Sequence, residues 1–333
     1  RVDGLEARVG ELEATQFSTT TKLKGQTTFV IGANSFSGDA KQANGVKRAD
    51  QAALTSGATT FNYDARFFLD TSFTGKDLLR TMVRAGNFGK SAFGGNGYVG
   101  LDALETAFEG AAGADVLTVN RIFYQFPIGE SVTATFGGVV RQDDMLAVWP
   151  SAYPADTVLD FFTYAGAPGA YQLALGSGAG LSWADNGFSI SANYVSTNGN
   201  VSNPREGGIA TDGAGSSGTV QLAYTADQWG LAAAYNYASG GNGVGIYGGN
   251  GTPFAVTAAS DANVNSVGLS AYWSPAESGW IPSISTGWGL SSGSHDDKKL
   301  DYTSKNATKF ELGFEGFTSQ SWYDGSSARF LVP

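Results

Sequence analysis

Few residues in this chain could support catalysis or metal binding. The sequence contains no Cys, which excludes disulfides, thiolate metal sites and a Cys nucleophile. Its single His, His295, lies in the polar run GSHDDKK beside Asp296, and Ser294 precedes it. A Ser-His dyad or a metal site is the alternative, but a polar run between two strands is typical of a solvated loop. We expect no catalytic residue, no metal site and no cofactor.

Two glycine patterns match the spacing of dinucleotide-binding loops. The pattern G-x-G-x-x-G occurs at Gly95, Gly97 and Gly100, and again at Gly243, Gly245 and Gly248. Phosphate binding by this pattern also needs a strand before it and a helix after it in a βαβ unit, and neither match has that context. With 47 glycines in 333 residues, such matches arise by chance. The sequence therefore does not predict nucleotide binding.

Charged side chains that alternate with apolar ones are the remaining candidates for function. They are Lys22, Lys24, Asp64, Arg66, Asp70, Arg80, Arg84, Lys309, Glu311 and Glu315. In a strand, every second residue points to the same face, so these residues share polar faces. If those faces surround water, the residues are candidates to line a pore, where a local excess of cations favours anions. The alternative role for each is a structural salt bridge across the wall.

A period of two residues recurs along most of the chain and predicts an all-β fold. We expect about thirteen strands. They lie near 21–33, 59–71, 78–88, 115–126, 131–141, 170–183, 187–196, 217–226, 229–239, 262–274, 278–291, 306–318 and 322–332. Tight gaps alternate with long ones rich in Gly, Asn and Ser, at 34–58, 89–114, 197–216 and 240–261. Short turns at one end and long loops at the other are typical of outer-membrane barrels.

The alternation has two explanations that differ in where the apolar faces lie. In a soluble sandwich they meet in a core, whereas in a membrane barrel they meet lipid. The membrane reading predicts aromatic residues at the lipid interface, near strand ends. The candidates are Trp229, Tyr235, Tyr237, Trp273, Trp280 and Trp288. The net charge of −10 argues against nucleic acid as a partner, because a phosphate backbone needs a basic surface.

Residues 1–16 follow a helical period instead. Val2, Leu5, Val9 and Leu12 have the spacing of a coiled-coil seam. Two heptads are marginal as an isolated helix, so we expect the seam to continue upstream and to pair with other copies. The alternative is a short amphipathic helix that packs on its own sheet. The chain begins at Arg1 without a leader pattern, which suggests a processed or partial chain.

Several segments resemble the cyanobacterial major outer-membrane porins, a family with an S-layer-homology domain, a coiled coil and an OprB-like barrel. The most similar stretch is FLDTSFTGKDLLRTMVRAGN, from Phe68 to Asn87, and within it the turn SFTGKD, from Ser72 to Asp77. NRIFYQFPIG, from Asn120 to Gly129, and GSGAGLSW, from Gly176 to Trp183, follow in the same order. The resemblance covers roughly residues 1–320 and favours the membrane reading.

The resemblance implies a function and a setting. It implies a trimeric, water-filled channel in the cell outer membrane, through which small solutes and inorganic ions diffuse, without enzymatic activity. It also implies a barrel of about 16 strands and attachment to peptidoglycan-linked polymer through an upstream domain that this sequence lacks. We therefore expect residues 17–333 to form a transmembrane antiparallel β-barrel that is incomplete at its C-terminus.

Two further expectations concern the loops. The long connection 89–114 is the candidate for a constriction inside the channel, and its stretch LDALETAF, from Leu101 to Phe108, could form a short helix. The competing function is a soluble or surface-displayed β protein that binds glycans through Gly/Asn-rich loops with exposed Trp and Tyr. Neither the solute nor the pore size can be read from the residues.

Overall fold

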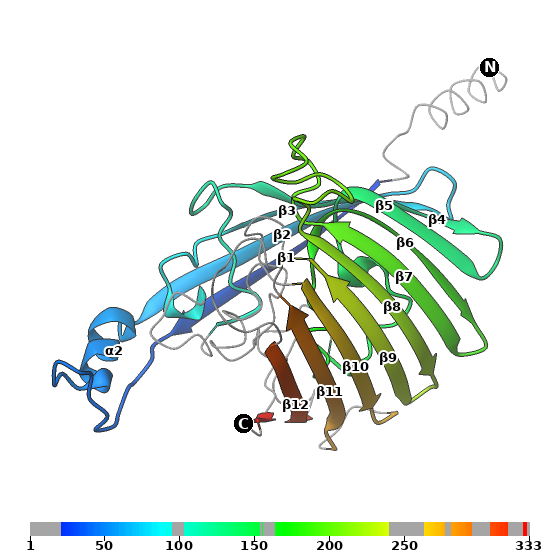
Figure 1. The fold of residues 1–333 in the computed structure, drawn as a ribbon. Coiled ribbons are helices and arrows are strands. Elements are labelled where there is room, and N and C mark those ends of the chain that lie inside the picture. Colours follow the sequence, from blue (N-terminus) through cyan, green and yellow to red (C-terminus); the bar gives the residue numbers. More distant parts are fainter. Residues whose placement is uncertain are drawn as a thin grey trace, which may run out of the picture.

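The computed structural model describes residues 21–94, 103–153, 155, 164–239, 263–276, 281–294, 307–318 and 329–331. These residues form one antiparallel sheet of 13 strands, in which each strand pairs with its neighbours in sequence (Figure 1). The strands are β1 (Thr21–Gly32), β2 (Thr60–Thr71), β3 (Leu78–Gly86), β4 (Thr118–Ile128), β5 (Val132–Arg141), β6 (Leu175–Asp185), β7 (Phe188–Ser196), β8 (Ser216–Thr225), β9 (Trp229–Ala238), β10 (Asn263–Trp273), β11 (Ser283–Ser294), β12 (Ala307–Thr318) and β13 (Arg329–Leu331). The predicted all-β class is confirmed, and the coiled coil predicted over 1–16 lies outside the described residues.

Helical structure is sparse in the described part of the chain. It consists of the helix α2 (Arg48–Ser56) and the 3-10 turns η2 (Ala92–Gly94) and η4 (Gln142–Met145). The helix predicted over 101–108 is wrong for residues 103–108, which form a turn and extended chain. No helix among the described residues has the length and apolar character needed to span a membrane.

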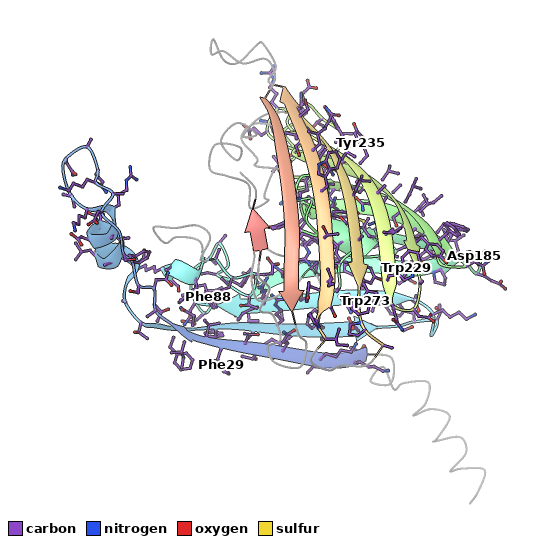
Figure 2. All side chains as sticks on the ribbon, turned by 90° about the horizontal axis from the view of Figure 1, so that it is seen from below. Phe29, Phe88, Asp185, Trp229, Tyr235 and Trp273 are labelled. Atoms are coloured by element: carbon purple, nitrogen blue, oxygen red, sulfur yellow. The ribbon has the colours of Figure 1, made fainter. Side chains whose placement is uncertain are left out.

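The sheet curves around an interior. Figure 2 shows β1–β3 crossing the view while β7–β12 stand upright, so the sheet bends strongly between these two parts. Among the described residues no backbone pairing joins β1 to β13. The number of strands in a closed barrel therefore stays a prediction.

Tight connections join strand pairs at one end of the sheet. Between β6 and β7 only Asn186 and Gly187 make the turn, with φ of 49° and 82°. Two successive positive φ values define the type I′ turn that two-residue hairpins prefer, and Asn-Gly is its favoured sequence. Connections at the other end are longer, such as 33–59, which holds α2, and 197–215. The predicted alternation of short and long connections is confirmed for these pairs.

Hydrophobic exposure is inverted relative to a soluble sheet. In β9 the exposed residues include Trp229, Leu231 and Tyr235, while Ala232 and Asn236 are buried. β7, β8 and β10 show the same alternation, with Ser, Thr, Asn and Gln buried and large apolar side chains exposed. The strands β1–β12 are 9 to 12 residues long. A tilted strand needs about 9 to 11 residues to cross a bilayer.

Aromatic residues gather near the strand ends on the outward face. Figure 2 shows Trp229, Trp273 and Tyr235 pointing away from the interior. Trp229 lies opposite Trp273 in the register, and its ring is 5.3 Å from that of Tyr224. Tyr237 is also exposed near the other end of β9. Four of the predicted interface residues thus lie where the membrane reading places them.

Two of the predicted interface residues differ. Trp288 lies in the middle of β11, opposite Leu269, because the strand extends six residues beyond it, to Ser294. Trp280 lies outside the described residues.

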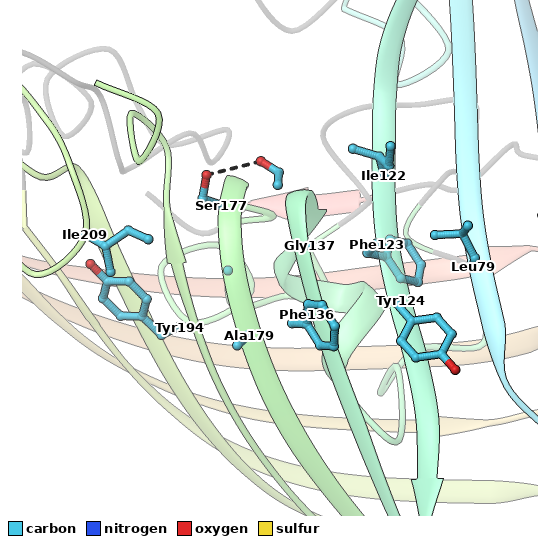
Figure 3. Close-up of a pocket in the computed structure, with 12 residues that line it drawn as sticks. Leu79, Ile122, Phe123, Tyr124, Phe136, Gly137, Ser177, Ala179, Tyr194 and Ile209 are labelled. Atoms are coloured by element: carbon cyan, nitrogen blue, oxygen red, sulfur yellow. Dashed lines mark hydrogen bonds between the residues drawn. The ribbon is translucent and has the colours of Figure 1, made fainter. Parts of the chain in front are cut away.

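A shallow outward depression of about 410 Å³ lies farther along the sheet, lined mostly by apolar side chains (Figure 3). Its rim includes Ser177, whose hydroxyl donates to the Gly138 carbonyl at 3.2 Å.

The turn SFTGKD between β2 and β3 is organised by one carboxylate. Asp77 accepts hydrogen bonds from the backbone N–H groups of Phe73 and Thr74 and from the hydroxyls of Ser72, Thr74 and Tyr124, at 2.7 to 3.0 Å. Burial opposes ionisation, but these donors outweigh it and hold the pKa of Asp77 well below its ordinary value. One carboxylate thus holds the turn SFTGKD together and also joins it to β4 through Tyr124.

Replacing Asp77 with alanine should destabilise the β2–β3 hairpin, because five donors lose their acceptor. The midpoint of urea unfolding should fall more than in Asp185→Ala, which removes a turn carboxylate that accepts a hydrogen bond from the Asn186 amide at 3.2 Å. The pKa of Asp77 is lower when folded, so its stabilisation is present above about pH 4 and lost as the pH falls below that. Equal midpoints for the two variants at pH 7 would contradict the assignment.

Candidate functional site

The described residues of the connection between β5 and β6, which are 142–153, 155 and 164–174, fold into the interior. Gln142 and Tyr171 are completely buried, and Ala165 and Ala167 are at most 2% exposed. Figure 1 shows the described part of this connection on the concave side of the sheet. We call these described residues between Gln142 and Ala174 the inner segment.

Amide and hydroxyl groups attach the inner segment to β8 and β9. The Gln142 amide donates to the Thr219 hydroxyl at 2.5 Å, and the Gln172 amide donates to Asn236 Oδ1 at 2.6 Å. Asn236 in turn donates to Thr219 at 2.8 Å. On β8, Gln221 donates to the Tyr171 hydroxyl at 3.0 Å. The segment therefore supplies hydrogen-bond partners to polar side chains on the inner face of these strands.

A second set of contacts attaches the segment to β10 and β11. The Ser270 hydroxyl donates to the Ala165 carbonyl at 2.7 Å, and the Ala152 N–H donates to the Ser285 hydroxyl at 2.8 Å. Gly287 faces the segment so closely that a Cβ there would lie 2.7 Å from the Gly166 Cα. Backbone-to-backbone approach of this kind requires glycine. The segment thus lies against a wall built from small and neutral residues.

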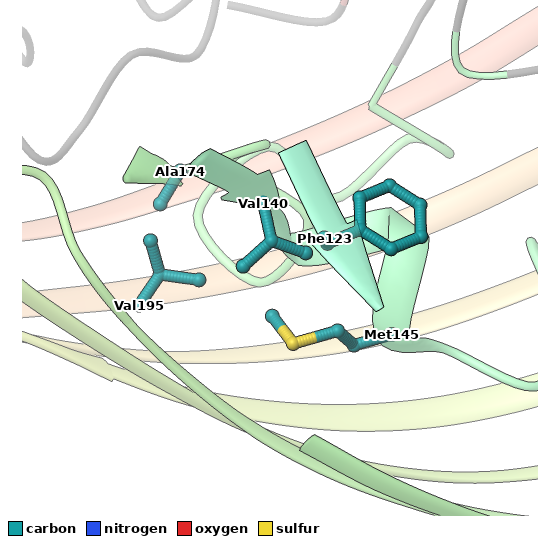
Figure 4. Close-up of a cluster of buried hydrophobic side chains, with 5 residues drawn as sticks. All are labelled: Phe123, Val140, Met145, Ala174 and Val195. Carbon is teal, nitrogen blue, oxygen red and sulfur yellow. The ribbon is translucent and has the colours of Figure 1, made fainter. Parts of the chain in front are cut away.

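An apolar cluster holds the two ends of the inner segment. Met145 from η4 and Ala174 pack with Phe123, Val140 and Val195 from β4, β5 and β7 (Figure 4). The Gln142 N–H donates to the Ala174 carbonyl at 2.9 Å, which brings the two ends together. This small core fixes where the segment enters and leaves the interior.

Arginines of β4 and β5 bind the acidic residues of η4. Arg121 contacts Asp144 at 2.7 Å, and Arg141 contacts Asp143 at 2.5 Å. Arg141 also lies 3.6 Å from Glu105, in the connection between β3 and β4. Ion pairs therefore link both long connections to the wall.

The most buried ion cluster joins β2 and β3. Asp64 is 1% exposed and contacts both Arg66 and Arg84 at 2.7 Å. Arg84 also donates to the Glu105 carbonyl at 3.3 Å and lies 4.4 Å from the centre of the Phe108 ring. Residues of the predicted loop 89–114 thus cover this cluster. Glu105 and Phe108 thus lie against β3, whereas the inner segment also contacts β8–β11.

A second ion cluster on the same face is accessible to solvent. Asp70 accepts two hydrogen bonds from Arg80, at 2.8 and 3.0 Å, and lies 3.3 Å from the Lys24 ammonium. The side chain of Lys24 is 64% exposed and that of Arg80 is 28% exposed. Lys22 lies opposite Asp70 in the register of β1 and β2 and is also exposed. The structure therefore divides the candidate residues into a covered and an accessible group.

Three of the candidate residues lie in β12. In the register, Lys309 is opposite Ser291, Glu311 is opposite Gly289 and Glu315 is opposite Ser285. Their side chains lie outside the described part. A pore-lining role stays a prediction for all ten candidates.

The sequence reasoning missed the inner segment. The gap between the predicted fifth and sixth strands was not among the long loops, and the sixth strand was predicted from residue 170, whereas β6 begins at Leu175. Composition was the available signal: residues 146–171 hold Trp149, Tyr153, Tyr164 and Tyr171 with many Ala residues, unlike the Gly/Asn/Ser-rich loops. Among the described residues no group of His, Cys, Asp or Glu is arranged to hold a metal ion. His295 and both glycine patterns lie outside the described residues.

No family model matches the chain. An uncharacterized protein of Nostoc sp. is 38% identical over 133 residues, which are 39% of this chain and 21% of that protein. An uncharacterized protein of Synechocystis sp. is 31% identical over 238 residues, which are 71% of this chain and 40% of that protein. The chain thus spans less than half the length of these curated relatives.

Solved structures similar to this chain include outer-membrane porins. OprB of Pseudomonas putida covers 92% of this chain and 73% of its own, with 11% identity and a TM-score of 0.44. The match with a variant of the Rhodopseudomonas blastica porin covers 93% of this chain and 92% of that porin, with 12% identity and a TM-score of 0.42. The match with OmpF of Salmonella typhi covers 88% of this chain and 85% of OmpF, with 13% identity and a TM-score of 0.37.

Proposed function

We propose that this chain forms the wall of a water-filled channel in the cell outer membrane, through which small solutes and inorganic ions diffuse passively. The observation that carries the proposal is the inverted exposure of the sheet. Large apolar side chains point outward and polar side chains inward, on strands long enough to cross a bilayer.

The outward face fits lipid better than water. Leu181, Leu222, Leu231 and Leu269 are each about half exposed or more and lie on four strands, β6, β8, β9 and β10. Apolar patches of this extent are rare on soluble monomers. A glycan-binding protein would carry its exposed Trp and Tyr in loops. Here Trp229, the described example with the clearest outward placement, lies on a strand, with the apolar band beside it.

The inner segment supplies a means of narrowing the channel. Its described residues lie against β7–β11. Glu105 and Phe108 approach the interior from the side of β2 and β3, where they contact Arg84 of β3. Selectivity in such a channel comes from the groups that remain accessible at its narrowest part. The proposal therefore extends to passage limited by size and charge, without a catalytic step.

The resemblance to the cyanobacterial porins extends the proposal to assembly. We propose a homotrimer in the outer membrane, attached to peptidoglycan-linked polymer through an upstream domain. β1 begins at the end of the sheet that carries the short turns, since Thr21 pairs with Thr71. We propose that this end faces the periplasm, where the short turns of outer-membrane barrels lie.

Single-channel recording in planar bilayers tests the proposal. The full chain, refolded in detergent and checked by heat-modifiable migration, should produce discrete conductance steps. Steps in groups of three would support the trimer. A folded chain that produces no steps, or that stays soluble and monodisperse without detergent, would contradict the proposal.

A further inference from the structure

Across β1–β11, the charged residues of the inner wall are gathered on the first five strands. Between Leu175 and Ser294 the strands β6–β11 carry a single charged residue, Asp185, at the tight turn. The first five strands carry many more on the interior face. They are Lys22, Lys24, Asp64, Arg66, Asp70, Arg80, Arg84, Arg121 and Arg141. Across β1–β11 the charged residues of the wall are therefore gathered on β1–β5, apart from Asp185.

Four of these cations form ion pairs with carboxylates and are shielded from solvent. The side chains of Arg66, Arg84, Arg121 and Arg141 are 3% to 9% exposed, and each lies within 2.7 Å of Asp64, Asp143 or Asp144. A buried ion pair presents little net charge to solvent. These arginines are structural, and a solute in the lumen does not reach them.

The remaining cations form an accessible group that we call the Asp70 cluster: Lys22, Lys24, Asp70 and Arg80. Asp70 is shared by Arg80 and Lys24, and Lys22 lies opposite it across the β1–β2 register. The cluster thus holds one carboxylate and three cations, two of which are exposed lysines, and Arg80 and Lys24 contact the carboxylate. The cluster has a positive excess on a chain whose net charge is −10.

We infer that the Asp70 cluster makes the channel prefer small anions, both inorganic anions and small carboxylates or phosphates, over cations. This inference rests on the proposed channel function. An exposed charge acts over a Debye length of about 8 to 10 Å at moderate salt, so two surplus cations on one wall raise the local anion concentration. Lys22 and Lys24 carry the preference because their ammonium groups are the most exposed members.

The test is the reversal potential of the full chain in planar bilayers under a tenfold KCl gradient. The unmodified chain should be more permeable to chloride than to potassium. The double variant Lys22→Gln/Lys24→Gln should lower the chloride-to-potassium permeability ratio by about threefold at 0.1 M salt, with the effect shrinking at 1 M as screening increases. Lys24→Glu, with Lys22 retained, should lower the ratio by a similar amount because it also changes the charge by two.

The matched control is Lys41→Gln/Lys47→Gln, which removes the same charge from the long connection between β1 and β2. A reversal potential unchanged in the control and shifted in the first variant supports the inference. Channels whose reversal potential is the same in all variants, or shifts equally in the control, overturn it and leave the channel itself standing. Absence of any conductance from the folded, unmodified chain overturns the channel proposal and this inference together.

Discussion

Replacing Asp64 with alanine is expected to lower the free energy of unfolding by about 3 to 5 kcal/mol. Asp64 is almost completely buried between the guanidinium groups of Arg66 and Arg84. Its removal leaves two neighbouring cations without their shared carboxylate under the cover of residues 104–109, and water cannot replace it there. The measurement is urea unfolding of the refolded chain in detergent or lipid vesicles.

Asp70→Ala is the matched control, because it removes the same group from the open cluster. Lys24 and Arg80 remain hydrated when Asp70 is lost, so the expected cost is about 1 kcal/mol or less. Combining Asp64→Ala with Arg84→Met should recover part of the loss by removing one of the unpaired cations. Equal unfolding midpoints for Asp64→Ala and Asp70→Ala would show that the covered cluster is hydrated in the folded protein.

The strands were predictable because a period of two assigns each residue to a face without knowledge of the rest of the chain. The segment predicted at 229–239 is β9 (Trp229–Ala238), and that at 187–196 is β7 (Phe188–Ser196). The start of β6 was not predictable in this way, since the residues just before it belong to the end of the inner segment. There Tyr171 contacts Gln221 of β8 and Gln172 contacts Asn236 of β9, and a period of two carries no information about such contacts.

The candidate site was predictable only as a set of residue types on a face. The sequence placed Asp64, Arg66 and Arg84 together, but it left open whether they meet solvent or one another. That outcome depends on Glu105 and Phe108, which reach Arg84 from a different connection. The inner segment was missed for the same reason. Its burial rests on partners far apart in sequence, such as Gln142 with Thr219, and periodicity carries no information about them.

Replacing residues 147–171 of the inner segment with a short Gly-Ser linker is expected to raise the single-channel conductance roughly two- to fourfold, since the segment fills part of the interior. Such a linker can close the gap because Arg141 and Leu175 are paired in the register and Gln142 bonds to Ala174. The wall behind the segment is made of Ser, Thr, Asn and Gln, which water can solvate once the segment is gone.

The matched control is a similar shortening of residues 197–215, whose ends are also joined by a pair, Ser196 with Ser216. That connection bonds largely within itself: Asn198 donates to the carbonyls of Glu206 and Gly213. Shortening it should leave the conductance close to that of the unmodified chain. If removal of the inner segment leaves the conductance unchanged in channels that still fold, the narrowest part of the channel lies elsewhere. The residues beside Arg84 would then be the constriction, because Glu105 and Phe108 cover the interior from that side.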